Sequence, residues 1–137
     1  MYVLVINCGS SSIKASVLDP SSGRRHQELT IERIGSAQCR ALLNDEPMEL
    51  GPMDHQAALE QMLPRLDLKG LLAVGHRVVH GGHAFSKPTL ITDDVIGEIE
   101  SLIPLAPLHN PVNLTGIRVA MQLVPETPHI AVFDTAF

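Results

Sequence analysis

The first 34 residues constrain the fold most, because three strand-like segments follow one another with only short turns between them. Residues 2–7 form an apolar run rich in β-branched side chains, and residues 11–18 alternate apolar and polar side chains. A Pro-Ser-Ser-Gly turn over residues 20–23 leads to a third alternating segment, residues 26–34. Strands joined by such short connections pair antiparallel, so the sequence predicts a three-stranded meander.

The rest of the chain alternates between helical and strand patterns. After a predicted loop over residues 44–52, Asp54 is a suitable N-cap for a helical pattern that Pro64 should end. The later predicted elements are a strand over 71–80, a helix capped by Thr92 or Asp93, a helix from Asn110 to about 123, and a strand over 129–133. This order predicts a mixed α/β domain with a twisted sheet that starts as a meander and carries packed helices.

Composition excludes several classes of protein. A chain of 137 residues that is 45% hydrophobic suits one folded domain. Ten Lys and Arg against fifteen Asp and Glu argue against a nucleic-acid-binding protein. No apolar stretch approaches the ~20 residues of a membrane helix, so we expect no membrane partner. Cys8 and Cys39 form no disulfide or zinc pattern, and no signal peptide is evident, so we expect a cytoplasmic protein.

The end of the chain predicts that something is missing. The sequence stops at Phe137, shortly after the buried-looking segment 129–133. A complete domain rarely ends there, so we expect segment 129–133 and Phe137 to expose apolar surface. Such a surface favours self-association.

The first candidate motif is the turn Asn-Cys-Gly-Ser-Ser-Ser-Ile-Lys, residues 7–14. Gly9 allows close approach of the backbone to an anion, serine hydroxyls and backbone N–H groups can donate to phosphate oxygens, and Lys14 supplies positive charge. The motif lacks the spacing of a Walker sequence. An ordinary polar hairpin turn is the alternative interpretation.

The second motif is His-Arg-Val-Val-His-Gly-Gly-His, residues 76–83. On a strand, Arg77 and Val79 share one face, and an arginine beside a small apolar side chain suits a small carboxylate. Alternatively, His76, His80 and His83 could ligate zinc, although no cysteine or carboxylate completes that set nearby. A third interpretation is that these histidines are structural and bond to the backbone.

Two further motifs lie near the end of the chain. The segment Pro-Leu-Ala-Pro-Leu-His-Asn-Pro, residues 104–111, is a rigid loop that would present His109 at a helix start, where an anion is favourable. A solvated histidine beside a helix cap is the alternative. Asp134 follows a buried strand, where α/β sheets place ligand groups, or else it caps a following helix.

Together, in this order and spacing, the four motifs closely resemble the amino-terminal part of acetate kinases and the related propionate kinases. The resemblance spans nearly the whole chain. It implies a ribonuclease-H-like domain of the actin, sugar kinase and heat-shock ATPase superfamily, in which two such domains enclose a cleft. Residues 1–137 would be the single amino-terminal domain, and the carboxy-terminal nucleotide-binding domain would be absent from this chain.

The resemblance also implies roles for residues at matching positions. It implies Asn7 for a magnesium site, Ser10, Ser12 and Lys14 for ATP and its phosphates, Arg77 for the substrate carboxylate, Val79 and Leu108 for the pocket of the alkyl tail, His109 for the transferring phosphoryl group, and Asp134 for catalysis.

The activity that the resemblance implies is reversible, magnesium-dependent phosphorylation of acetate by ATP, which yields acetyl phosphate and ADP. Acetate is already deprotonated at neutral pH, so positioning and charge neutralisation dominate, and Asp134 is expected to orient magnesium rather than remove a proton. Half a cleft should turn over slowly or not at all. Propionate kinase, or a non-catalytic fragment that binds anions or a partner, is the alternative. A homo-oligomer is expected, since full-length members of the family are dimers, although they dimerise chiefly through the second domain, which this chain would lack.

Overall fold

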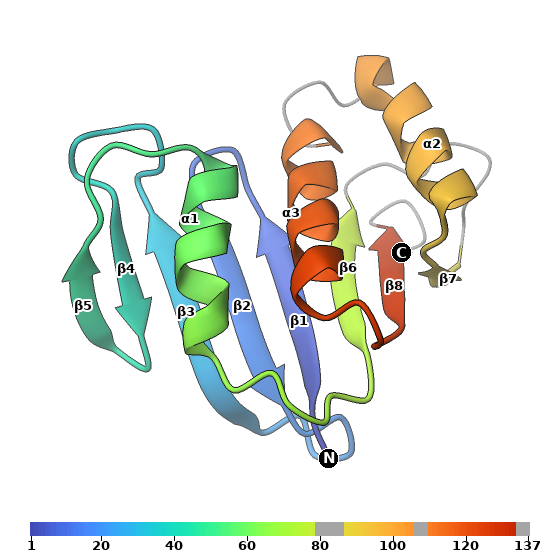
Figure 1. Ribbon diagram of the computed structural model, residues 1–137, viewed down its shortest axis with the longest axis horizontal. Coiled ribbons are helices and arrows are strands. Elements are labelled where there is room, and N and C mark those ends of the chain that lie inside the picture. The colour runs from blue at the N-terminus through green and yellow to red at the C-terminus, as the bar shows by residue number, and fades with distance from the viewer. Residues whose placement is uncertain (79–86, 106–109, 134–137) are drawn as a thin grey trace.

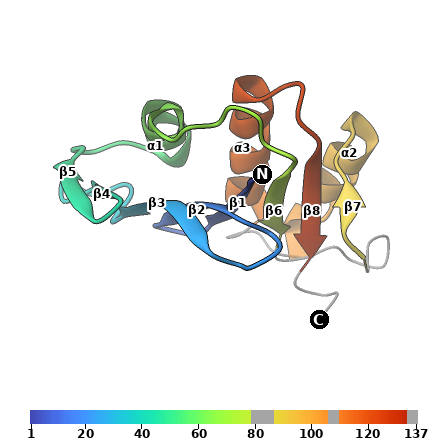
Figure 2. The same ribbon diagram turned by 90° about the horizontal axis from the view of Figure 1, so that it is seen from below.

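The computed structural model describes residues 1–78, 87–105 and 110–133, and within these ranges it is a mixed β-sheet with helices packed on one face (Figures 1 and 2). The strands are β1 (Val3–Cys8), β2 (Ile13–Leu18), β3 (Arg25–Glu32), β4 (Arg40–Leu43), β5 (Glu46–Glu49), β6 (Val74–Val78), β7 (Thr89–Leu90) and β8 (His129–Phe133). The helices are α1 (His55–Met62), α2 (Asp93–Ser101) and α3 (Asn110–Leu123), with short 3₁₀ turns η1 (Leu63–Arg65) and η2 (Ile103–Leu105).

The sheet has the order β5-β4-β3-β2-β1-β6-β8-β7. The first three strands along the chain, β1, β2 and β3, form the predicted antiparallel meander. In contrast, β6 is parallel to both β1 and β8, because α1 separates β1 from β6 and the helices α2 and α3 separate β6 from β8. Strands β1, β6 and β8 therefore end on the same side of the molecule. We call this side, with the β1–β2 turn and the first turns of α1 and α3, the carboxyl edge (Figure 1).

The core lies between the sheet and the helices, and strand alternation explains its composition. In β1, Leu4, Ile6 and Cys8 are buried, whereas Val5 is 39% exposed. One buried cluster joins the meander to α1 and α3, and a second joins β6 and β8 to α2 and α3. The opposite face of the sheet carries no described helix (Figure 2).

The region predicted as a loop over residues 44–52 is instead part of a hairpin formed by β4 and β5, so that prediction is wrong. Asn44 and Asp45 both adopt positive φ, at 50° and 69°, as a tight two-residue hairpin turn requires. Pro47 looked like a strand breaker. It is tolerated because β5 is an edge strand, where a missing N–H costs no pairing on the outer side.

The helix predictions are confirmed. The Asp54 carboxylate accepts a hydrogen bond from the Ala57 N–H at 2.8 Å, and α1 ends at Met62, just before the turn that contains Pro64. Thr92, rather than Asp93, caps α2. None of the described helices is long and apolar enough to cross a membrane.

The predicted exposure of strand 129–133 is wrong for the face toward the helices, whereas Ile130 and Val132 on the other face are only partly buried. Strand β7, which the sequence did not reveal, pairs with β8 and forms the sheet edge in its place. Ala131 and Phe133 are both fully buried, under the cluster that includes Ile99 of α2. Phe137 lies outside the described residues. Strand β6 also begins at Val74, later than predicted.

Candidate phosphate and carboxylate site

Three polar side chains from adjacent strands share the helix-free face of the sheet near the carboxyl edge. Asn7 of β1 pairs directly with Lys14 of β2. On the other side of β1, Ile6 pairs with His76 of β6, and both are buried toward the helices. The next residues, Asn7 and Arg77, therefore face the opposite way. Lys14 and Arg77 are exposed and Asn7 is half-buried, so two cations flank an amide on one surface.

The β1–β2 turn lies beside this row and is compact. The Gly9 N–H donates to the Ser12 carbonyl at 2.7 Å, and the Ile34 N–H donates to the Ser11 carbonyl at 2.9 Å. A Cβ atom at Gly9 would lie only 3.0 Å from the Ser12 hydroxyl oxygen. Ser10 is exposed and Ser12 is half-buried, so the turn presents hydroxyl groups at the carboxyl edge.

Two side chains that sequence analysis missed hold this turn from the helix side of the sheet. His55, the first residue of α1, has its Nε2 atom 2.7 Å from the Gly9 carbonyl oxygen. Asn113 of α3 is 3% exposed, and its amide donates to the Cys8 carbonyl at 3.0 Å. These contacts span 46 and 105 residues of chain, and no local pattern reveals them.

Cys8 itself is structural. Its thiol packs so closely against α3 that a Cβ atom at Gly116 would lie 2.8 Å from the sulfur. Burial raises the pKa of the Cys8 thiol to about 12, so the thiolate that nucleophilic chemistry needs is not formed near neutral pH.

His76 is committed to a buried partner rather than to a metal. The His76 Nε2 and His129 Nδ1 atoms are 3.0 Å apart, and the His129 Nε2 is 2.9 Å from the Val124 carbonyl oxygen. Because a carbonyl only accepts, His129 carries its proton on Nε2, and His76 must donate to the bare Nδ1. Burial, helped by the neighbouring His129, lowers the pKa of His76 to about 3.

This pairing counts against both histidine alternatives at His76, since its Nε2 is already bonded to the His129 ring and not to the backbone. His80 and His83 lie outside the described residues. Within the ranges that the structure describes, no three potential His, Cys, Asp or Glu ligands gather at one point.

Four of the predicted site residues lie outside the described residues: Val79, Leu108, His109 and Asp134. Their described neighbours in the chain are the last residue of β6, the first of α3 and the last of β8. All three of those element ends are at the carboxyl edge (Figure 1). Of the five described residues, Asn7, Lys14 and Arg77 share one face, and Ser10 and Ser12 lie in the adjoining turn.

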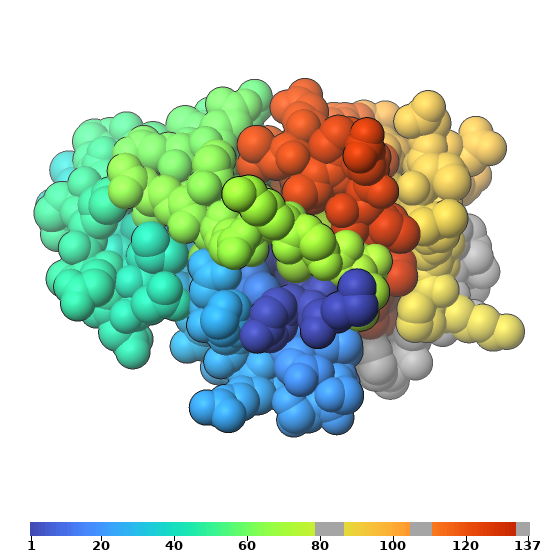
Figure 3. Space-filling model, turned by 60° about the horizontal axis from the view of Figure 1, so that its bottom comes forward, coloured from blue at the N-terminus to red at the C-terminus, as the bar shows by residue number. Residues whose placement is uncertain are grey.

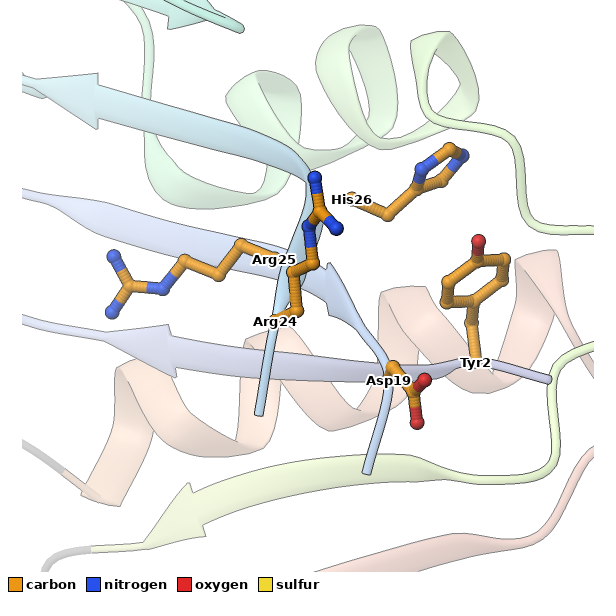
Figure 4. Close-up of a pocket in the computed structure, with 5 residues that line it drawn as sticks. All are labelled: Tyr2, Asp19, Arg24, Arg25 and His26. Carbon is orange, nitrogen blue, oxygen red and sulfur yellow. The ribbon is translucent and has the colours of Figure 1, made fainter. Parts of the chain in front are cut away.

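A surface hollow of about 400 Å³ lies elsewhere, at the opposite end of the sheet (Figure 4). It is lined by Tyr2, Asp19, Arg24, Arg25 and His26. The Tyr2 and His26 rings stack at 4.6 Å, and Arg25 turns away to pair with Glu28 at 2.7 Å. This hollow contains none of the predicted site residues, so its volume does not identify the site.

Comparison with known proteins identifies the family of this chain. The model of the family described as "Acetokinase family" matches residues 2–137. The chain is 50% identical to an acetate kinase of Streptomyces avermitilis and 44% identical to one of Deinococcus radiodurans, over 98% and 100% of its length.

Solved structures show the same fold. A propionate kinase from Francisella tularensis superposes with a TM-score of 0.90 at 38% identity, over 98% of this chain and 37% of that one. An acetate kinase from Porphyromonas gingivalis gives 0.87 at 39% identity, over 99% of this chain and 38% of that one. The expected fold class, an α/β domain of this kinase fold, is thereby confirmed.

The chain spans 36% of the length of both curated relatives. The family model's matched range includes the β1–β2 turn, the strand that carries Arg77 and the segment after β8. On the agreement of sequence and fold, this chain belongs to the acetokinase family.

Proposed function

We propose that this chain supplies the carboxylate- and phosphate-binding half of a kinase that reversibly transfers the γ-phosphoryl group of ATP to acetate. The observation that carries the proposal is the row of Lys14, Asn7 and Arg77 beside the Gly–Ser turn. Two anions must approach one another in this reaction, and two cations flanking an amide on one surface suit that task.

Arg77 is proposed to bind the carboxylate of the acceptor. Its guanidinium group is always charged and can hold both carboxylate oxygens at once, which fixes the direction of attack. Lys14, the pairing partner of Asn7, is proposed to neutralise phosphate charge, with the Ser10 and Ser12 hydroxyls as donors. No general base is required, because a carboxylate with a pKa of about 4 is already ionised at neutral pH.

The described donors fit a magnesium ion that is carried mainly by the nucleotide. Magnesium prefers oxygen ligands, keeps several waters and uses few protein groups when phosphates bind it. The half-buried Asn7 amide, at the end of β1, can supply one such oxygen. When bound, the ion would neutralise phosphate charge. Asp134 is proposed to orient it, and His109 to contact the transferring phosphoryl group.

Acetate and propionate differ by one methylene group, which discriminates by only ~1–3 kcal/mol. Val79 and Leu108 are proposed to form part of the pocket for the alkyl tail. Propionate kinase therefore remains the alternative, in line with the name of one similar structure. We further propose that residues 1–137 form the amino-terminal domain of a cytoplasmic, homo-oligomeric, two-domain enzyme whose other domain completes the ATP site.

A chimera tests this proposal. The chain replaces the matching first part of the Streptomyces avermitilis acetate kinase, and acyl phosphate is trapped with hydroxylamine in the presence of MgATP and acetate or propionate. We expect product. Arg77→Ala should lower kcat/KM for the carboxylate by ~10–100-fold, since a charged hydrogen bond contributes ~1.5–3 kcal/mol.

Arg118→Ala is the matched control. Arg118 is an exposed arginine on α3 that pairs with Glu100 at 2.6 Å, and its loss should leave the rate unchanged. A folded chimera without product, or an Arg77→Ala chimera as active as the parent, would contradict the proposal.

A further inference from the structure

We propose that His55 is a positioning residue that aims the Ser10 backbone N–H at a phosphate oxygen by holding the Gly9 carbonyl. This inference deepens the proposed function and rests on it. His55 is not among the residues that the family resemblance assigned to the site.

The first peptide group, between Cys8 and Gly9, is fully used inside the protein. Its carbonyl oxygen accepts from the buried Asn113 amide at 3.0 Å. Its N–H, on Gly9, donates to the Ser12 carbonyl at 2.7 Å. This peptide is therefore fixed at both ends, and it fixes the start of the next one.

The second peptide group, between Gly9 and Ser10, is held at one end only. Its carbonyl oxygen lies 2.7 Å from the His55 Nε2. All peptide bonds in the described residues are trans, so the Ser10 N–H points opposite to that carbonyl, away from α1. Within the described part of the chain the Ser10 N–H has no hydrogen-bond acceptor.

A glycine on one side makes this peptide easy to rotate, since Gly9 has no side chain to restrict its backbone dihedral angles. Without the His55 contact, the peptide between Gly9 and Ser10 would have no hydrogen bond of its own among the described residues, and only the neighbouring groups held by Asn113 and Ile34 would limit its rotation. A carbonyl oxygen only accepts, so the His55 Nε2 is the donor in this contact.

His55 is itself well placed for this task. It is the first residue of α1, directly after the N-cap Asp54, so the helix start fixes its backbone. The ring is only partly buried, which makes replacement tolerable for folding. Gln56, the next residue, is exposed and bonds to Glu60 at 3.0 Å on the same helix, so it offers a matched control.

The direct test measures the direction of the Ser10 N–H bond through its residual dipolar coupling in the ¹⁵N-labelled chain, with the strand amides as the reference frame. In the parent chain the coupling should fit a vector that points away from α1. In His55→Leu it should depart from that value, and in His55→Gln, which keeps an N–H donor, it should return toward it. Gln56→Leu should match the parent.

The functional test uses the chimera. His55→Leu should lower kcat/KM for ATP by about tenfold, the size of one lost hydrogen bond, while KM for acetate stays constant. His55→Gln should recover most of the loss. A residual dipolar coupling unchanged by His55→Leu would overturn the inference, as would equal losses for ATP and acetate. An inactive parent chimera with the expected couplings would instead contradict the proposed function and leave the geometry established.

Discussion

The two turns of the meander perform the same connection at opposite ends of the sheet, but they are held in different ways. The β2–β3 turn is closed by its own residues. The Asp19 carboxylate accepts from the Ser21 N–H and hydroxyl at 2.9 and 2.7 Å, and the Gly23 N–H donates to the Asp19 carbonyl at 2.7 Å. The hydroxyl bond of Ser21 is the main cause that lowers the pKa of Asp19.

The β1–β2 turn is held largely from outside. Its carbonyl groups bind His55 of α1, Asn113 of α3 and the N–H of Ile34, which follows β3. A turn whose carbonyls are satisfied by distant parts of the fold can leave hydroxyl and N–H donors for a ligand. A turn closed by its own residues serves the fold, whereas a turn held by remote contacts can serve a site.

The largest expected effect is a loss in the free energy of unfolding at low pH, caused by the buried pair of histidines in β6 and β8. The His76–His129 pair joins β6, which carries Arg77, to β8. The folded pKa of His76, about 3, lies below its usual value of 6.5, so between these limits only the unfolded chain binds the proton. The contribution of neutral His76 to the free energy of unfolding is therefore fully present above pH 6.5. As the pH falls below 6.5, this contribution is lost by up to ~1.4 kcal/mol per pH unit.

Urea unfolding of the chain between pH 7.5 and 5.0 measures this slope. His76→Gln should flatten it, because an amide can still donate to His129 but does not titrate. His26→Gln, at an exposed histidine near the β2–β3 turn, should leave the slope as it was. A free energy of unfolding that does not change with pH would contradict this prediction, because the buried histidine pair would then not make the stability of the chain depend on pH.

The close packing of α3 against β1 predicts the next largest effect. A Cβ atom at Gly116 would lie 2.8 Å from the Cys8 sulfur, a buried atom directly before the β1–β2 turn. Gly116→Ala should therefore lower the free energy of unfolding by ~1–3 kcal/mol. Gly97→Ala is the matched control in α2, where a Cβ atom meets nothing within 4 Å.

Gly97→Ala should stabilise the chain by ~0.5–1 kcal/mol, because alanine favours the helical state over glycine. Urea denaturation of both variants measures the two opposite signs. If Gly116→Ala were neutral, the contact that supports the turn from α3 would be softer than the structure indicates.

The sequence predicted whatever depends on local pattern. The meander, the caps of α1 and α2 and the direction of Arg77 all follow from alternation, capping residues and turns. It missed the β4–β5 hairpin, because Pro47 is normal only on an edge strand, and edge position depends on the whole sheet.

The site divides in the same way. Residues in the motifs could be named from their chemistry and from family resemblance. The residues that support these motifs could not be named from the sequence, because only the packing of distant elements brings them into contact with the turn. His55 looks like any polar residue at a helix start, and Asn113 reaches the turn across 105 residues of chain. The connection from α1 to β6, which lies beside the N-terminal residues and donates from the Leu72 N–H to the Tyr2 carbonyl, likewise has no local signature (Figure 3).

A pair of glycine substitutions tests the contrast between the turns directly. Gly23 of the β2–β3 turn has φ at 73°, and a Cβ atom there meets nothing within 4 Å. Gly23→Ala should lower the free energy of unfolding by ~1–2 kcal/mol through backbone strain and leave the activity of the chimera unchanged. Gly9 does not have positive φ, but a Cβ atom there lies 3.0 Å from the Ser12 hydroxyl.

In Gly9→Ala the Ser12 side chain can rotate away, so the free energy of unfolding should change by less than ~1 kcal/mol. The displaced hydroxyl should still lower kcat/KM for ATP by ~5–10-fold, as one lost hydrogen bond does. Urea unfolding of the chain and hydroxamate formation by the chimera measure the two quantities separately. If Gly23→Ala lowers only the free energy of unfolding and Gly9→Ala lowers mainly kcat/KM, then the β2–β3 turn affects stability and the β1–β2 turn affects turnover. A fully active Gly9→Ala chimera would remove the Ser12 hydroxyl from the phosphate site.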